Sequence, residues 1–446
     1  MRGIMIAVAI GAALFGLAQV WFPIEHALLI GLVALLVTLW TNEALPLGVV
    51  SMLPILLFPI FGILTVNEVT ANYSKSIIFL FLGGFMLAIA IEKTELHKYF
   101  SAKLLSFFPK TPRGIIYALA ITSALLSAVL SNTTITLMLM PIALFLSENV
   151  RLKVRFLLAT AYGASIGGIL TPIGTPPNLI LMGFLEDHHL PMMTFGGWML
   201  LMLPVVGVML LIMPYILSLG VSDECVEDVA QEIPRLNGEQ KRLYGIVGML
   251  AFVLIANTFL KQFIGVAMNE KLILLGFGLL MFVPKVGFLT WEDTRSLPYE
   301  IIFLFGAGFS IAAAFMSTGL AEDIAEKLHV ISTLPFFWIL VVVALFVTFS
   351  TEITSNTALT SIAIPIFYEF AKTMPENQST VILLTATVAA SYAFMLPIAT
   401  PPNAIVMSSR VIRIREMATI GLKLNFIGAA ILSLVAYFIW GWMVSV

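Results

Sequence analysis

The sequence Ser-Asn-Thr occurs twice in this 446-residue chain, each time near the middle of a long apolar stretch. The copies lie at 131–133 and 355–357, inside the apolar stretches 114–148 and 334–370. Hydrocarbon offers no hydrogen-bond partners, so polar backbone at membrane depth is tolerated only where it is buried in protein or lines a cavity. Two matching polar clusters therefore predict one site built from two similar halves.

The composition is typical of a polytopic helical membrane protein. The chain is 60% hydrophobic and only 11% charged, whereas a soluble domain carries about 25% charged residues. Its single cysteine, Cys225, excludes an internal disulfide and a cysteine-rich metal site. The five histidines are dispersed near segment ends, so we expect no transition-metal centre. No small-x-small cleavage pattern follows the apolar N-terminal segment, which is expected to remain as the first helix.

Apolar segments long enough to cross a bilayer predict eleven membrane crossings. They lie near 4–22, 25–40, 44–63, 76–92, 156–186, 195–219, 243–260, 269–284, 300–317, 377–409 and 420–444. The two Ser-Asn-Thr stretches should each enter and leave on one side of the membrane. For 114–148 this fits either a re-entrant helical hairpin or two full spans, and the uncharged tip favours the hairpin. With a cytoplasmic N-terminus, 18 of the 23 Lys and Arg residues fall in cytoplasmic loops, a strong positive-inside bias. An odd number of crossings then places the C-terminus outside.

The two halves of the chain repeat. Residues 77–96 and 301–320 share 11 of 20 identities without a gap, and the same shift of 224 aligns Ser131 with Ser355. Five predicted crossings separate the two copies, so they should run in opposite directions through the membrane. Inverted repeats are a recurring architecture of secondary transporters, whose binding sites lie near the midplane at the repeat interface.

The Ser-Asn-Thr tips should begin helices. Ser, Asn and Thr are good N-cap residues, so the second arms of the hairpins are expected to run from Thr134 to about Phe145 and from Ala358 onward. The unpaired N–H groups and positive dipole ends of these arms would face the tips. Each tip can therefore stabilise an anion.

A second repeated motif, Thr-Pro-Pro-Asn, follows each tip at 175–178 and 400–403. The two prolines remove backbone donors and break a spanning helix. Upstream carbonyls near Gly174 and Ala399 should lose their partners, and free carbonyls in a protein-lined cavity suit a hard cation such as Na⁺. Neither motif contains Lys or Arg, so a buried anion would depend on neutral donors, helix dipoles and co-bound cations.

Other polar features leave alternatives open. Glu352 lies three residues before Ser355 and has no equivalent acid in the first half; it could serve a cation site, titrate as a proton site, or simply face water or a neighbouring donor. Gly83 and Gly84 favour close helix packing over a ligand site. Residues 93–108 predict an amphipathic helix on the cytoplasmic surface, and 220–242 predict a solvated connector between halves.

One run of residues resembles the signature of the divalent anion–sodium symporter family. The run comprises Ser391, Phe394, Pro397, Ile398, Ala399, Asn403, Ile405 and Val406. Members of that family also carry two Ser-Asn-Thr motifs, and the resemblance covers nearly the whole chain, which is similar to the bacterial dicarboxylate members of INDY type. Many members read Ser-Asn-Thr-Ala-Thr, whereas the tips here read SNTTIT and SNTALT.

The resemblance implies an all-α elevator-type transporter with eleven transmembrane helices and two re-entrant hairpins in inverted repeats. It implies a homodimer, a scaffold formed by 1–112 and 220–332, and a mobile transport unit formed by 113–219 and 333–446, with helix breaks at 171–178 and 397–403. The implied substrate contacts are Asn132, Thr133, Asn356, Thr357 and Pro401. The implied sodium ligands are Ser127, Ser131, Asn132 and Gly174 at one site, and Thr351, Thr354, Asn356 and Ala399 at the other.

These expectations combine into sodium-coupled import of C4-dicarboxylates such as succinate, malate and fumarate across an inner or plasma membrane. The partners would be a dianionic carboxylate, Na⁺ and the lipid bilayer, with no nucleic acid and no other cofactor. The alternatives are a sodium-independent dicarboxylate exchanger of the same fold and a sulfate or citrate transporter. A channel or membrane sensor lacks a supporting signalling domain, and no catalytic constellation supports an enzyme.

Overall fold

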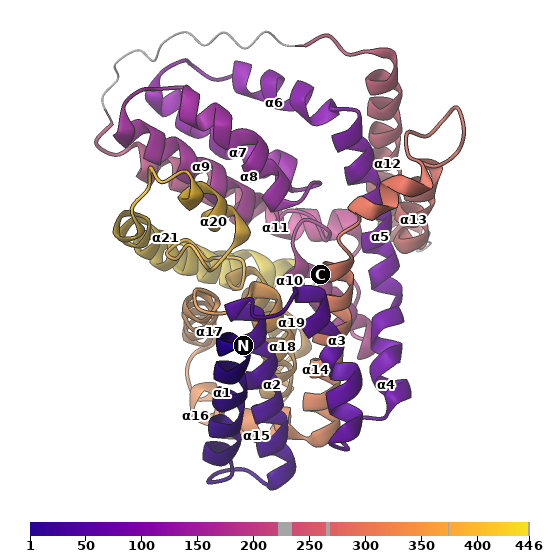
Figure 1. The fold of residues 1–446 in the computed structure, drawn as a ribbon, viewed down its shortest axis with the longest axis vertical. Coiled ribbons are helices and arrows are strands. Elements are labelled where there is room, and N and C mark those ends of the chain that lie inside the picture. Colours follow the sequence, from indigo (N-terminus) through magenta and orange to yellow (C-terminus); the bar gives the residue numbers. More distant parts are fainter. Residues whose placement is uncertain (222–233, 265–267, 373, 445–446) are drawn as a thin grey trace.

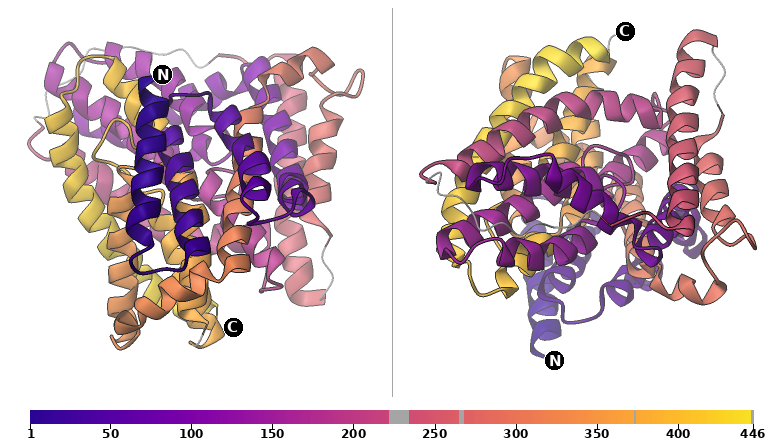
Figure 2. Two further views of the ribbon diagram at one scale, coloured as in Figure 1. Left: turned by 60° about the horizontal axis from the view of Figure 1, so that its bottom comes forward. Right: turned by 90° about the horizontal axis from the view of Figure 1, so that it is seen from above.

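A computed structural model describes residues 1–221, 234–264, 268–372 and 374–444 of the protein. All regular elements in these residues are helices (Figure 1 and Figure 2), which confirms the predicted all-α class. Cys225 and much of the predicted connector at 220–242 lie outside the described residues.

The first half contains α1 (Arg2–Ala18), α2 (Ile24–Asn42), α3 (Leu47–Ile60), α4 (Val66–Ala71), the short η1 (Asn72–Ser74), α5 (Ser76–Lys93), α6 (Leu96–Ser106), α7 (Pro112–Ser127), α8 (Asn132–Phe145), α9 (Val150–Gly167), α10 (Pro176–Asp187) and α11 (Phe195–Ser218). The second half contains α12 (Gly238–Ile264), α13 (Glu270–Leu280), η2 (Trp291–Ser296), α14 (Tyr299–Thr318), α15 (Leu320–Lys327), α16 (His329–Ser332), α17 (Phe336–Thr351), α18 (Asn356–Ala371), α19 (Glu376–Ala389), α20 (Pro401–Ser408), α21 (Ile414–Val435), η3 (Ala436–Trp440) and α22 (Gly441–Met443).

The helix boundaries repeat with the sequence. The bounds of α7 and α17 coincide when one is shifted by 224 residues, and α8 and α18 begin at the equivalent Asn132 and Asn356. A shift of 225 brings the start of α10 at Pro176 onto the start of α20 at Pro401. The same local signals therefore begin and end the same helices in both halves: N-cap residues at the tips and prolines at the first helical turns.

Six helical segments of the described chain are long and apolar enough to cross a membrane. They are Ile24–Asn42, Val66–Lys93, Phe195–Ser218, Gly238–Leu260, Tyr299–Thr318 and Ile414–Met443. Both arms of the first hairpin and the first arm of the second are apolar but shorter, as expected for re-entrant segments. The predicted segments 156–186 and 377–409 are each interrupted, as their Pro-Pro motifs predict. The count of eleven crossings stays a prediction.

Ion pairs join distant segments that the predicted topology places on one side of the membrane. Lys93 at the end of α5 pairs with Asp293 in η2 at 2.6 Å, and this hydrogen bond from the ammonium group holds the pKa of Asp293 below its ordinary value. Lys75 pairs with Asp187, and Lys271 pairs with Glu186, among groups predicted to lie outside. The pairings agree with the predicted grouping of loops.

The apolar residues pack into two clusters. The smaller one joins α1 to α4 with α14 and α15, and the larger one contains the hairpins, the broken helices, α11 and α21. Close packing brings α5 against α13: a Cβ on Gly83 would lie 2.4 Å from the carbonyl oxygen of Leu274. Gly83 is thus a helix-packing position, as predicted. The predicted amphipathic helix also forms, as α6.

Candidate functional site

The tip of each hairpin is a short turn between two helices. In the first, Ser131 caps α8 by accepting a hydrogen bond from the N–H of Thr134 at 3.1 Å. In the second, Ser355 occupies the cap position of α18 without a side-chain hydrogen bond. Both arms begin two residues earlier than predicted, because Asn132 and Asn356 themselves take the first helical position.

Each tip pairs its Asn with a hydroxyl from the end of the preceding arm. Ser127 donates a hydrogen bond to Oδ1 of Asn132. Thr351 Oγ1 lies 2.6 Å from Oδ1 of Asn356 and 3.0 Å from the carbonyl oxygen of Ala390. A hydroxyl carries one proton, so it can satisfy only one of these two acceptors at a time. The second tip therefore gathers three oxygens around one proton, an arrangement that suits a hard cation.

The amide nitrogens of the two Asn side chains remain available. Nδ2 of Asn132 and Nδ2 of Asn356 donate no hydrogen bond to the part of the chain that the structure describes. Both side chains are half-buried, as is Thr133, whereas Thr357 is buried and Pro401 is exposed at the start of α20. Each tip thus offers oxygens on one side and a free N–H donor on the other.

A buried Asn bridges each helix break. Between α9 and α10, Nδ2 of Asn178 donates to the carbonyls of Gly168 and Thr171 at 3.1 and 2.8 Å. Between α19 and α20, Nδ2 of Asn403 donates to the equivalent carbonyls of Ala393 and Leu396, at 2.9 and 3.1 Å. These carbonyls are satisfied, so only part of the predicted loss of partners occurs.

The roles of these two Asn residues were missed by sequence reasoning, although Thr-Pro-Pro-Asn gave a signal. An Asn three residues after the Thr recurs in both halves, and both Asn178 and Asn403 are fully buried. A buried NH₂ group is usually hydrogen-bonded, and Nδ2 of each residue is, whereas Oδ1 of each has no hydrogen-bond partner in the part of the chain that the structure describes. The broken backbone just upstream supplies carbonyl acceptors for the NH₂ group.

Two carbonyls do remain free. Those of Gly174 and Ala399 accept no hydrogen bond from the described residues, as predicted. Gly174 O lies beside Asn132 at the first tip: a Cβ added to Gly168 would be 3.0 Å from both Gly174 O and Asn132 Oδ1. At the second site, the hydroxyl of Thr354 is engaged elsewhere, donating to Ser350 O at 2.9 Å.

The halves exchange contacts at the tips. Helix α20 of the second half packs against α8 and α9 of the first, while α10 of the first half packs against α18 and α19 of the second (Figure 1). Each helix that begins at a Thr-Pro-Pro-Asn motif therefore follows the break in its own half and packs against a hairpin arm of the other half. This exchange brings the two polar clusters into one assembly.

Comparisons with known proteins establish the family. The family model described as citrate transporter matches residues 33–390. The chain belongs to this family. Two curated relatives, both described as sodium-dependent dicarboxylate transporter SdcS, come from Staphylococcus saprophyticus and Staphylococcus aureus. Each is 30% identical over 98% of this chain and 91% of its own length.

This citrate-transporter family member is therefore a multi-pass membrane transporter and not an enzyme. The resemblance carried by the Ser391–Val406 run is confirmed. The crystal structure of the Alcanivorax borkumensis YdaH transporter matches with a TM-score of 0.58 at 16% identity, covering 94% of this chain and 99% of that one. That similarity concerns the fold alone.

Glu352 of this transporter holds the second break in place. Its carboxylate is buried, with 3% of the residue exposed. It accepts hydrogen bonds from the N–H groups of Met395 and Leu396 at 2.8 and 2.9 Å, and from Nδ2 of Asn425 on α21 at 2.7 Å. Among the alternatives left open by the sequence, the geometry agrees with a carboxylate facing neighbouring donors.

Proposed function

We propose that this transporter is a sodium-coupled symporter that imports C4-dicarboxylates such as succinate, malate and fumarate. The observation that carries the proposal is the duplicated Asn–hydroxyl pair: Ser127 with Asn132 and Thr351 with Asn356. Each pair offers oxygens for a cation and leaves an amide donor for a carboxylate. The names of the staphylococcal relatives support both sodium and dicarboxylate.

Coupling between sodium binding and substrate binding follows from the absence of fixed positive charge at the hairpin tips and helix breaks. The segments 127–134, 168–178, 351–358 and 390–403 contain no Lys or Arg. Burying an uncompensated dianion costs many kcal/mol. Bound Na⁺ lowers that cost, and by linkage the dianion raises the affinity for Na⁺ by the same factor.

The residues divide into two sodium sites and one substrate site. The first sodium site would use Ser127, Ser131, Asn132 and the carbonyl of Gly174; the second would use Thr351, Thr354, Asn356 and Ala399. Substrate carboxylates would contact Asn132, Thr133, Asn356, Thr357 and Pro401. Thr357 is buried and Thr354 bonds to Ser350, so their participation requires local rearrangement on binding.

Transport would follow an elevator mechanism. The transport unit would comprise 113–219 and 333–446 and would move against a scaffold of 1–112 and 220–332 in a homodimer. The exchange of contacts between α20 and α8 and between α10 and α18 supports movement of both hairpins as one unit. The N-terminus would be cytoplasmic and the C-terminus outside.

Uptake of labelled succinate into proteoliposomes tests the function. We expect accumulation with an inward sodium gradient and little uptake with potassium in its place. Uptake that ignores sodium but requires internal dicarboxylate would establish the exchanger instead. Citrate is the second candidate substrate, because the matching family model is described as a citrate transporter. Competition by succinate, citrate and sulfate at varied sodium separates these substrates.

Substitution of the paired Asn residues tests the site. Asn132→Ala and Asn356→Ala should each abolish uptake, because each removes an oxygen ligand and a free amide donor. Each variant should still unfold cooperatively in detergent, because neither Nδ2 bonds to the described chain and the one hydrogen bond lost, from Ser127 or Thr351, costs about 1–3 kcal/mol. Normal uptake by either variant at low sodium would contradict a shared two-half site.

A further inference from the structure

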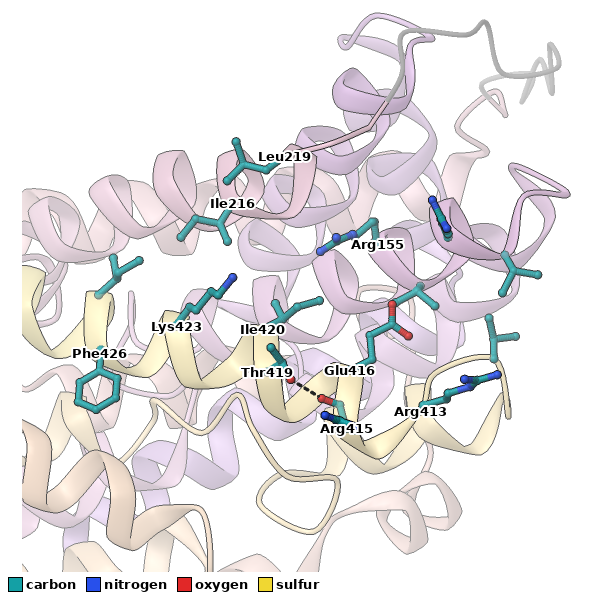
Figure 3. Close-up of a pocket in the computed structure, with 15 residues that line it drawn as sticks. Arg155, Ile216, Leu219, Arg413, Arg415, Glu416, Thr419, Ile420, Lys423 and Phe426 are labelled. Carbon is teal, nitrogen blue, oxygen red and sulfur yellow. Dashed lines mark hydrogen bonds between the residues drawn. The ribbon is translucent and has the colours of Figure 1, made fainter.

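A basic cavity lies away from the hairpin tips. It has a volume of about 1280 Å³ and is formed by the start of α9, the end of α11 and the start of α21 (Figure 3). Two helices come from the first half and one from the second. Its charged lining consists of five cations and one acid: Arg151, Arg155, Arg413, Arg415, Lys423 and Glu416.

The five cations have no anionic partner in the described chain. None forms an ion pair or a side-chain hydrogen bond with the described residues. In Figure 3, Arg155 and Lys423 extend into the space between the helices, and Glu416 points into it from α21. The one carboxylate cannot balance five positive charges, so the cavity has a surplus of positive charge.

The helix ends add to this surplus. Arg151 lies in the first turn of α9, and Arg413 is the N-cap residue of α21. Helix N-termini carry a partial positive charge, where cations are unfavourable and anions are favoured. A folded chain that gathers cations at two helix N-termini gains stability from a bound anion. Four of the five are Arg, whose planar donors match phosphate oxygens in pairs.

The rest of the cavity lining is mostly apolar and includes side chains exposed where lipid is expected. Ile216, Ile420 and Ile427 line it, and Leu219 and Phe426 are 53% and 51% exposed. Helices α11 and α21 are both candidate membrane spans, and the cavity lies at one end of each. The positive-inside topology places this end in the cytoplasm. Basic pockets between transmembrane helices on that side suit anionic headgroups.

We propose that this cavity binds the phosphate headgroup of an anionic phospholipid from the surrounding bilayer, with its acyl chains along the exposed apolar rim. The site is separate from the transport site: Arg155 precedes Gly167, the last residue of α9 before the break, by 12 residues, which is about 18 Å along a helix. A lipid bound here would link α9 and α11 of the first half to α21 of the second.

Native mass spectrometry of the full-length protein tests the proposal. The protein is purified in detergent and exposed to phosphatidylglycerol or to phosphatidylcholine with the same acyl chains. We expect the protein to retain phosphatidylglycerol in preference to phosphatidylcholine. The double variant Arg155→Gln with Arg413→Gln should lower that retention about tenfold, because two phosphate donors are lost.

Lys153→Gln is the matched control. Lys153 lies on the same turn of α9 but pairs with Glu148 at 3.4 Å and does not line the cavity. The Lys153→Gln substitution removes one positive charge from this end of α9. This variant should retain the lipid like the unmodified protein. An equal loss in the control would show a general charge effect and overturn the site. Thermal unfolding in detergent confirms that each variant is folded. The single variant Arg413→Gln, at an exposed position, gives a second measurement of lipid retention and removes one charge, as the control does.

A soluble anion is the other source of the same chemistry. Millimolar inorganic phosphate is added to lipid-free protein, and thermal unfolding is compared with that in phosphatidylglycerol. We expect stabilisation by the lipid and little by phosphate, because phosphate has no acyl chains for the apolar rim. Equal stabilisation by inorganic phosphate, or equal retention of both lipids, would overturn the proposal. Because lipid binding is measured without transport, the outcome is independent of the proposed function.

Discussion

The hydroxyl of Thr351 lies 2.6 Å from Oδ1 of Asn356, at the tip of the second hairpin. Its counterpart in the first half is Ser127, which donates to Asn132. The two pairs are related by the same shift of 224 residues that relates the helices around them. Each pair places two oxygens together, and in each the proton on the hydroxyl would have to turn away when a cation binds.

The hydroxyls should therefore set the affinity for sodium. Ser127→Ala and Thr351→Val each remove one oxygen ligand without adding bulk. We expect the sodium concentration for half-maximal uptake to rise about tenfold in each variant, equivalent to roughly 1.4 kcal/mol. Sodium dependence of succinate uptake in proteoliposomes measures this.

Thr385→Val is the matched control for these hydroxyls. Thr385 is equally buried on α19, and its hydroxyl donates to Val381 O of the same helix at 2.7 Å. Its sodium dependence should not change. A shift in the control equal to that of Thr351→Val would mean that any buried hydroxyl in this region has the effect.

Asn178 and Asn403 should be structural supports of the breaks. Asn178→Leu and Asn403→Leu each leave one carbonyl, that of Gly168 or Ala393, without a donor. The carbonyls of Thr171 and Leu396 keep the hydrogen bonds that they accept from the N–H groups of Gly174 and Ala399. An unsatisfied buried polar group costs about 1–3 kcal/mol, so each variant should lose unfolding free energy of that order. The unfolding temperature in detergent should fall for both variants. It should stay unchanged for Asn67→Leu, because Asn67 is exposed on α4. Wild-type stability of either buried variant would refute the bridging role.

Glu352 should act through the second break and not as a direct ligand of substrate. Glu352→Gln keeps the size of the side chain but replaces one carboxylate oxygen with an NH₂ group. That group would face an N–H donor that bonds to the carboxylate in the unmodified protein. We expect lower thermal stability, and a several-fold rise in the sodium needed for uptake, because Met395 and Leu396 lead into Ala399. Glu369→Gln serves as a control, since Glu369 pairs with Lys372 away from the break.

A double-mutant cycle separates this role from a general loss of charge. Asn425 donates directly to Glu352 at 2.7 Å. The losses of stability in Glu352→Gln and Asn425→Leu should not add in the combined variant, with a coupling of at least about 1 kcal/mol, as found for contacting residues. Additive losses, together with unchanged sodium dependence, would mean that the hydrogen bonds of Glu352 do not position the break.

Local chemistry made the outline of this fold predictable. The hairpin tips and both breaks follow from N-cap residues and prolines, which act on their own few residues. Thus α8 begins at Asn132 and α10 at Pro176, close to where the sequence places them. These signals need no knowledge of the rest of the chain.

Tertiary partners were not predictable in the same way. The donors to Glu352 come from residues 43, 44 and 73 positions away, and the contact between α10 and α18 joins helices from different halves of the chain. The bridging by Asn403 also depends on the shape of the broken backbone. Such contacts depend on packing, and no local pattern encodes them.

Gly168 offers the sharpest test of the first sodium site. It follows α9 directly, and a Cβ added there would lie 3.0 Å from Oδ1 of Asn132 and 3.0 Å from the carbonyl oxygen of Gly174. Both oxygens belong to the proposed site, and contacts this short require a neighbour to shift. The equivalent position in the second half is Ala393, so the backbone of the break itself accommodates a Cβ.

Gly168→Ala should therefore fold normally. It should lose sodium binding at the first site and, with it, sodium-coupled uptake. We expect uptake at physiological sodium to fall by about tenfold or more, as for loss of more than 1.4 kcal/mol of binding, with thermal unfolding little changed. Gly207→Ala on α11 is the control, because a Cβ there meets no atom within 4 Å. Wild-type sodium dependence in Gly168→Ala would show that the oxygens of Asn132 and Gly174 do not hold the ion together. The same result with reduced stability would instead show that the glycine serves only to let the break form.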